Sequence, residues 1–239
     1  MGTQLCIYCQ RRPATTRDHV PPKLLFPPPR PSSLITVPAC KRCNEKASLD
    51  DEHFRTYLGA RQETENDWIV DQLRYATFRS FDRNPKYYNA WFRETSWVNV
   101  VDDFGNVVGR KMQFRRNYDR IEPVIKRIVR GLHFRKFSVP LPVSCPFIVV
   151  DHGGFDALAT APGTPLADLL AEFRAEPATV VDKYVFSYKR LDVVGDDTKS
   201  VWLLTFFRRL WFLVYVNVNE ADYRDKLKPK PRAPLTYDQ

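Results

Sequence analysis

Two pairs of cysteines are the residues whose types and spacing most clearly indicate chemistry in this chain. Cys6 and Cys9 form one CxxC pair, and Cys40 and Cys43 form the other. Four thiolates from two such pairs can close a tetrahedral site around one Zn²⁺ ion. In a chain of 239 residues with five cysteines, this pattern favours a structural zinc site in a reducing compartment over a disulfide framework.

The segment between the pairs supplies a second group of candidates. Asp18 and His19 are adjacent, and Asn44 directly follows the last paired cysteine, so zinc binding would bring Asn44 toward the dipeptide. A neutral imidazole can take a proton from water near pH 7. Carboxylate and amide oxygens suit Mg²⁺ or Mn²⁺ and leave positions open for phosphate oxygens. The three side chains therefore predict phosphodiester hydrolysis.

Adjacent residues of an extended segment point to opposite sides. Asp18 and His19 can therefore share a reaction only if the strand lies between metal and water, or if a local twist turns both side chains into one cleft. The sequence leaves both arrangements open.

The motifs DHVPPK, VPACKRCN and SLDDEHFR, taken together, resemble the HNH endonuclease family. The resemblance covers residues 4 to about 57 and implies a ββα-metal core with its histidine on the first strand. It implies that His19 is the general base, that Asp18 and Asn44 hold a catalytic Mg²⁺ or Mn²⁺, and that the four paired cysteines hold structural zinc. Many zinc-containing members carry asparagine, as at Asn44, where the family name implies a final histidine.

The chain departs from the family pattern at the middle asparagine, which orients the base and has no match in SSLITVPAC. A backbone carbonyl near Leu34 or Ile35 could orient His19 instead. After the second cysteine pair, a helix can begin at Lys41, and Ser48 and Asp51 match a capping box that would start or restart a helix over 50–60. We expect the acidic residues there to favour the helix N-terminus rather than to bind metal. We expect His53 to be a surface or packing residue.

The charge of the chain indicates its partners. A net charge of +9 favours a polyanion, with DNA as the expected substrate and RNA not excluded by the motif. Candidate nucleic-acid contacts are Arg17, Lys23, Arg30 and Lys41. No run of about 18 apolar residues predicts a membrane span, and the N-terminus lacks the apolar core of a signal peptide, so we expect a cytoplasmic protein. The oligomeric state is not predicted.

Hydrophobic periodicity and turn residues predict the elements that position these side chains. The proline-rich run 20–32 predicts an irregular loop. Helices are expected over 68–81, 86–93, 118–134 and 165–174, and strands over 34–37, 96–101, 107–114, 147–150, 183–191, 201–207 and 210–218. The basic side of the 118–134 helix is expected to be solvated or to contact nucleic acid; it carries Arg120, Lys126, Arg127 and Arg130.

The predicted fold class is α+β. A ββα-metal core of the HNH type, held by a four-cysteine zinc site, would occupy residues 1–60. A larger mixed region with an antiparallel sheet and no assigned role would occupy 61–224, and 225–239 would be a disordered tail. The leading function is a metal-dependent endonuclease acting on DNA. The alternative is a non-catalytic, zinc-stabilised module that binds nucleic acid or protein.

Overall fold

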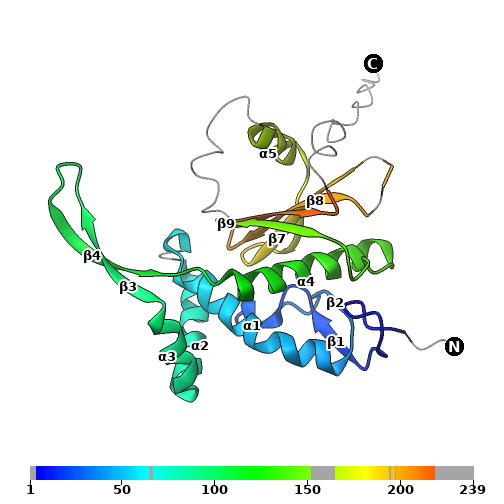
Figure 1. The fold of residues 1–239 in the computed structure, drawn as a ribbon, viewed down its shortest axis with the longest axis horizontal. Coiled ribbons are helices and arrows are strands. Elements are labelled where there is room, and N and C mark those ends of the chain that lie inside the picture. Colours follow the sequence, from blue (N-terminus) through cyan, green and yellow to red (C-terminus); the bar gives the residue numbers. More distant parts are fainter. Residues whose placement is uncertain (1–3, 65–66, 152–164, 194, 197, 219–239) are drawn as a thin grey trace.

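A computed structural model describes residues 4–64, 67–151, 165–193, 195–196 and 198–218. The predicted tail, 225–239, lies outside these residues. The described part is a mixed α+β structure whose strands all pair antiparallel, in three separate sheets (Figure 1). The predicted α+β class is therefore confirmed.

The N-terminal unit has the order strand, strand, helix. β1 (Thr16–His19) pairs antiparallel with β2 (Thr36–Ala39), and α1 (Lys41–Ala60) follows directly. The proline-rich loop between the strands contains only a short 3₁₀ turn, η1 (Lys23–Leu25). Prolines remove backbone donors, which explains why this long segment forms no other element.

Helix α1 begins at Lys41, as one predicted alternative has it, and continues to Ala60 without a second start, so the predicted capping box at Ser48 is wrong. The Ser48 hydroxyl donates to the Glu45 carbonyl at 2.8 Å, within the helix. The helix begins just after Cys40, whose carbonyl accepts from the Asn44 N–H at 3.1 Å. The backbone donors near Ser48 consequently already have helical partners, and the acidic residues that follow lie in the middle of the helix.

Two shorter helices follow α1. α2 (Trp68–Arg83) begins at Asp67, whose carboxylate accepts from the Ile69 and Val70 N–H groups. α3 (Pro85–Arg93) begins at Asn84, whose side chain accepts from the Tyr87 N–H. Arg74 of α2 donates to the Gly59 carbonyl at 2.8 Å, which joins α2 to the end of α1.

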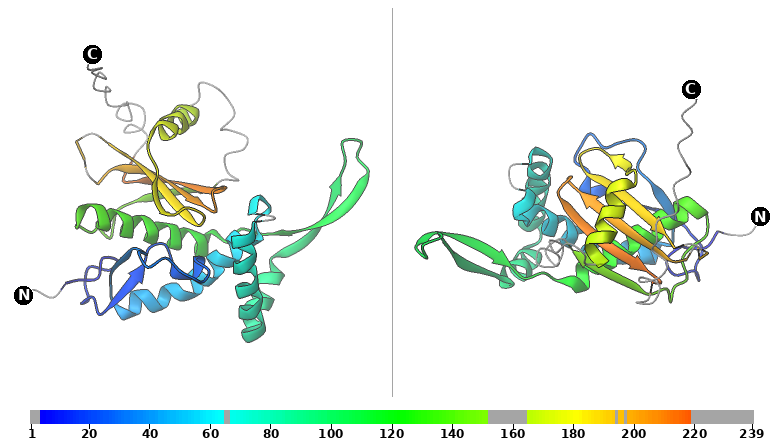
Figure 2. Two further views of the ribbon diagram at one scale, coloured as in Figure 1. Left: turned by 180° about the vertical axis from the view of Figure 1, so that it is seen from behind. Right: turned by 90° about the horizontal axis from the view of Figure 1, so that it is seen from above.

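A two-stranded ribbon then leaves the body of the molecule. β3 (Thr95–Val101) and β4 (Val107–Phe114) pair only with each other and project outward in each view (Figures 1 and 2). At the turn, the Asp102 carboxylate accepts from the N–H groups of Phe104 and Asn106. The predicted hairpin is confirmed, and we call this ribbon the arm.

Helix α4 (Tyr118–Phe137) lies between the N-terminal unit and the large sheet (Figure 2). Its apolar side is buried, as its periodicity predicts. Its basic side is not simply solvated: Arg127 is buried against the N-terminal unit, and Arg120 lies 3.6 Å from Asp50 of α1. The predicted solvated or nucleic-acid face is therefore wrong for Arg127.

The large sheet has the strand order β5-β9-β8-β7-β6. Helix α5 (Pro165–Ala175) covers one face through Leu169 and Phe173. The 179–182 strand is absent from the sequence-based expectation, because its two apolar residues, Val180 and Val181, are adjacent and show no alternation. The strands are β5 (Phe147–Asp151), β6 (Thr179–Asp182), β7 (Phe186–Asp192), β8 (Ser200–Phe206) and β9 (Leu210–Val216).

The main hydrophobic core contains residues from both predicted domains. Phe54 of α1 packs against Phe206 and Phe212 of the sheet, with ring centroids 5.3 and 5.8 Å apart. The predicted boundary at residue 60 coincides with the end of α1, but the two segments share their core. Among the described residues, no helix has the length and apolar character needed to cross a membrane.

Candidate metal centre and the surface around His19

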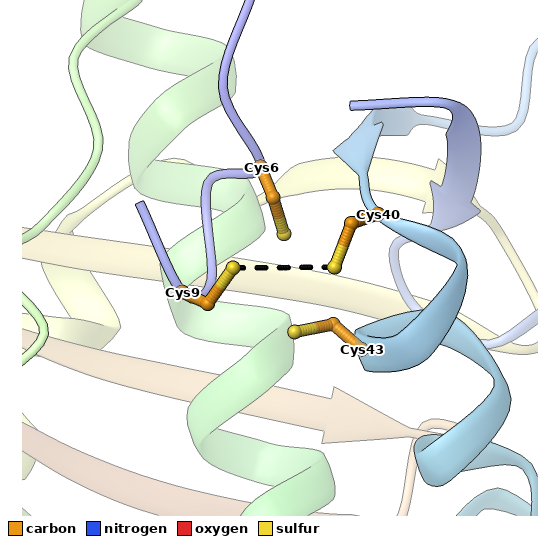
Figure 3. Close-up of side chains that lie close together, drawn as sticks. All are labelled: Cys6, Cys9, Cys40 and Cys43. Atoms are coloured by element: carbon orange, nitrogen blue, oxygen red, sulfur yellow. Dashed lines mark hydrogen bonds between the residues drawn. The ribbon is translucent and has the colours of Figure 1, made fainter. Parts of the chain in front are cut away.

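The four paired cysteines converge on one point. Cys6 and Cys9 lie on the N-terminal loop, Cys40 caps α1, and Cys43 lies in its first turn (Figure 3). All four sulfur atoms lie within 4.8 Å of one another, and the Cys9 and Cys40 sulfurs are 3.9 Å apart. The N-terminal loop and the start of α1 therefore form one four-thiol cluster.

The cluster fits a zinc ion. Tetrahedral Zn–S bonds of about 2.3 Å require sulfur atoms about 3.8 Å apart, close to the observed separation. The backbone N–H groups of Arg11 and Arg12 point at Cys9 and lower the pKa of its thiol to about 6, although burial opposes this shift. Burial, by contrast, raises the pKa of the Cys6 and Cys43 thiols. The fit to zinc therefore rests on the spacing of the four sulfur atoms, and metal binding would displace their protons.

Asp18 belongs to a buried network rather than to an open site. Its side chain is 5% exposed. Its Oδ2 atom accepts from the Tyr8 hydroxyl at 2.7 Å and lies 3.1 Å from Nε of Arg127. The same guanidinium donates to Asp51 of α1. Arg127 thus joins strand β1, helix α1 and helix α4 at one point.

Burial determines the electrostatics of this network. Burial raises the pKa of Asp51 to about 6, although Arg127 opposes the shift. Burial disfavours the charged form of Arg127, but Asp18 and Asp51 outweigh it and raise the pKa of the guanidinium. Burial and the neighbouring Asp18 also raise the pKa of Tyr8. Arg127 therefore stays charged, and Tyr8 stays a neutral donor.

Asn44 lies beside strand β1. Its amide nitrogen donates to the Thr16 hydroxyl at 3.3 Å and to the Arg17 carbonyl at 3.4 Å. Helix α1 therefore brings Asn44 to the strand that carries Asp18, as zinc closure predicts. The two side chains do not fit an open Mg²⁺ or Mn²⁺ site in this arrangement, because the Asp18 carboxylate is buried and its Oδ2 atom is in contact with both Tyr8 and Arg127.

His19 is separated from Asp18 by the alternation of the strand. Asp18 is buried, whereas His19 is half-buried and shares the other face of β1 with exposed Arg17. Burial lowers the pKa of His19, with further lowering from Lys23 and Arg30, so the imidazole is neutral at pH 7. Within the described residues, its ring has no hydrogen-bond partner.

Of the two carbonyls expected to orient His19, that of Ile35 accepts from the Val20 N–H at 2.9 Å. The four predicted nucleic-acid contacts are all exposed. Arg17 donates to Thr36, and Arg30 donates to the carbonyls of Lys23 and Phe26. These bonds hold cationic side chains near His19. Lys41 lies at the other end of the unit, 3.7 Å from Glu45.

His53 does not belong to this surface. Its side chain is 7% exposed and packs against Trp91, with ring centroids 5.0 Å apart.

Within the described residues, the four cysteines are the only group of three or more cysteine, histidine or acidic side chains close enough to share a metal ion. Three residues of the Asp18 network have no signal in the sequence, because only packing brings them together: Tyr8, Asp51 and Arg127.

The fold and the site define an α+β protein with a ββα unit, a cluster of four cysteines at one end of that unit that could hold a metal ion, and a neutral histidine on a basic surface. Comparisons with protein-family models, curated proteins and solved structures found no match.

Proposed function

We propose that this chain is a metal-dependent endonuclease of the HNH type that hydrolyses phosphodiester bonds in DNA. The observation that carries the proposal is His19, a neutral imidazole on the first strand of a ββα unit, beside cationic side chains. A neutral imidazole can accept a proton from water, and Lys23 and Arg30 can offset the charge of a phosphate. The cysteine centre, filled by zinc, would hold the strand and helix together.

The divalent metal is the least supported part of the proposal. Asp18 and Asn44 are its ligands by resemblance, but Asp18 is paired with Arg127. A metal could use Asp18 only if the guanidinium moved away, so no reaction step is assigned to the metal. The proposal also places the protein in the cytoplasm, where reducing conditions keep the thiols available for zinc.

The pairing of Asp18 favours a second candidate function. A protein that binds nucleic acid without cleaving it would keep the zinc centre and the basic surface, and it would need no open carboxylate. This candidate is a zinc-stabilised binding module, and it differs from the endonuclease in retaining binding without cleavage.

Supercoiled plasmid incubated with the protein and Mg²⁺ or Mn²⁺ tests the proposal. We expect nicking by the wild-type chain and its loss in His19→Ala, with Arg135→Ala as a control because Arg135 is exposed on α4. Fluorescence anisotropy with labelled DNA and RNA should show that His19→Ala still binds. Binding without cleavage by the wild type would select the second candidate, and no binding to either polymer would contradict both.

A further inference from the structure

The arm is a surface that the rest of the described chain leaves uncovered. Its two strands pair only with each other, and nearly every residue along them is exposed. Three views show the ribbon extending away from the body (Figures 1 and 2). A lone two-stranded ribbon is at best marginally stable in water, so a second surface is needed to cover it.

One face of the arm carries two apolar pairs. The register places Trp97 opposite Met112, and Val101 opposite Val107 across a bulge in the ribbon. The pair between them on this face, Asn99 opposite Arg110, is polar. Trp97 is 69% exposed, and Phe104 at the turn is 90% exposed. Adjacent exposed apolar side chains of this size mark a protein interaction surface.

The charge of the arm favours a protein over a nucleic acid as its occupant. Asp102 and Asp103 balance Arg110 and Lys111, so residues 95–114 carry no formal net charge in a chain of net charge +9. A nucleic acid is held mainly by excess positive charge, which the arm lacks. Two copies of this basic chain repel each other over most surfaces, and the neutral arm is a place where they can meet.

The base of the arm borders a hollow that is lined by basic side chains, whereas the tip of the arm is acidic. The hollow, of about 820 Å³, lies between β3–β4, the end of α1 and the β8–β9 turn. Four cations line it, namely Arg61, Lys111, Arg116 and Arg209. Of these, Arg61 pairs with Glu63, and Arg116 pairs with the buried Asp151. The tip of the arm has the opposite charge, because Asp102 and Asp103 are acidic. The aromatic Phe104 follows them at the tip.

The tip cannot reach the hollow of its own chain. The seven residues of β3 separate tip from base by about 24 Å at 3.4 Å per residue. A second copy whose arm runs in the opposite direction would place its tip at this base. The same rotation would place the first tip in the second hollow, as a two-fold interface requires.

We propose that two copies of this chain form a dimer through their arms, which pack face to face and run in opposite directions. The faces that carry Trp97 and Met112 cover each other, and each acidic tip enters the basic hollow of the other copy. This interface does not depend on nuclease activity.

Light scattering after size exclusion, over a range of protein concentrations, tests the proposal. The wild type should approach twice the chain mass of 27.9 kDa. Asp103→Lys and Lys111→Glu should each weaken association at least tenfold, since each creates like-charge contacts. An equimolar mixture of the two variants should associate more tightly than either variant alone, because each residue 103 then meets a residue 111 of opposite charge.

Asp82→Lys is the matched control, because Asp82 is exposed on α2, away from the arm; this variant should dimerise normally. Circular dichroism should show that all variants are folded. A wild type that stays at 27.9 kDa at every concentration would overturn the proposal. So would a dimer that persists unchanged in both single variants, or a mixture that associates no better than either variant alone.

Discussion

Arg127 changes the interpretation of the DH dipeptide more than any other residue. The sequence places it on the basic side of an amphipathic helix, whereas the structure buries it between the carboxylates of Asp18 and Asp51. A carboxylate paired in this way contributes to the packing of three elements. Its availability to a metal then depends on the position of one guanidinium.

Replacing Arg127 by methionine should lower the free energy of unfolding by about 3 to 5 kcal/mol, because two buried carboxylates lose their partner. Arg127→Lys should not fully restore stability, since an ammonium cannot bridge both carboxylates as the planar guanidinium does. Urea unfolding measures both effects. Arg135→Met, on the exposed side of the same helix, should change stability little; an equally small change in Arg127→Met would contradict the assigned role.

His53 gives a pH-dependent prediction. Burial, with a smaller contribution from Arg120, lowers its pKa to about 4 in the folded chain, below the unfolded value of about 6.5. The unfolded state therefore binds the proton first, so the stability that His53 contributes is complete above pH 6.5 and is lost as the pH falls toward 4.

His53→Phe should remove this loss while keeping contact with Trp91. Between about pH 7 and pH 4.5, the wild type should lose roughly 2 to 3 kcal/mol more unfolding free energy than the variant. Urea unfolding of both proteins at the two pH values measures the difference. Parallel pH dependences would show that His53 is not held neutral by burial.

At the scale of elements, helix α4 packs against the N-terminal unit. At Gly131 the helix lies so close to Val20 that a side chain larger than that of glycine would clash. A Cβ atom at Gly131 would lie 2.5 Å from Cγ2 of Val20, which is 1% exposed. Gly131→Ala should therefore lower stability by about 1 to 3 kcal/mol through overpacking, although alanine is the better helix former.

Gly59→Ala is the matched comparison, since its Cβ would have an ordinary 3.7 Å contact with Arg74. This variant should be neutral or stabilised by up to about 1 kcal/mol. Thermal unfolding of the two variants separates packing from helix propensity. A stabilised Gly131→Ala would mean that α4 and the loop after β1 are not in close contact.

The cysteine centre joins the N-terminal loop to the first turn of α1, so metal removal should loosen that end first. We expect Cys40→Ser or a chelator to release zinc and to increase hydrogen exchange in β1 and the start of α1. Metal analysis and exchange measurements test this. Cys145→Ser is the control, because Cys145 lies far along the chain and outside the cluster. Unchanged zinc content in Cys40→Ser would contradict the assignment.

At the scale of the whole molecule, the N-terminal unit buries its apolar side against the rest of the chain. Phe54 meets the large sheet, and Val20 meets α4. A fragment of residues 1–60 with zinc should therefore lack a cooperative thermal transition by circular dichroism, because its core partners are missing. A cooperative transition in the zinc-loaded fragment would support the predicted domain boundary.

Local signals in the sequence were enough to predict much of this protein. The CxxC spacing predicts that the two thiols of each pair can bind one ion together, since two residues between cysteines allow both sulfurs to lie on one side of a tight turn. Helical periodicity predicts α4, and the turn residues at 102–106 predict the arm. These features depend on residues that are close along the chain.

Contacts between distant segments required the tertiary structure. The sequence could not show that Arg127 holds Asp18, or that the Ile35 carbonyl accepts from the Val20 N–H. Each depends on elements that meet only after the chain folds, where burial and charge pairing outweigh local preference. For the same reason, the sequence alone predicted four thiols that can hold zinc, whereas only the packing of α4 against β1 decided that the Asp18 carboxylate pairs with Arg127.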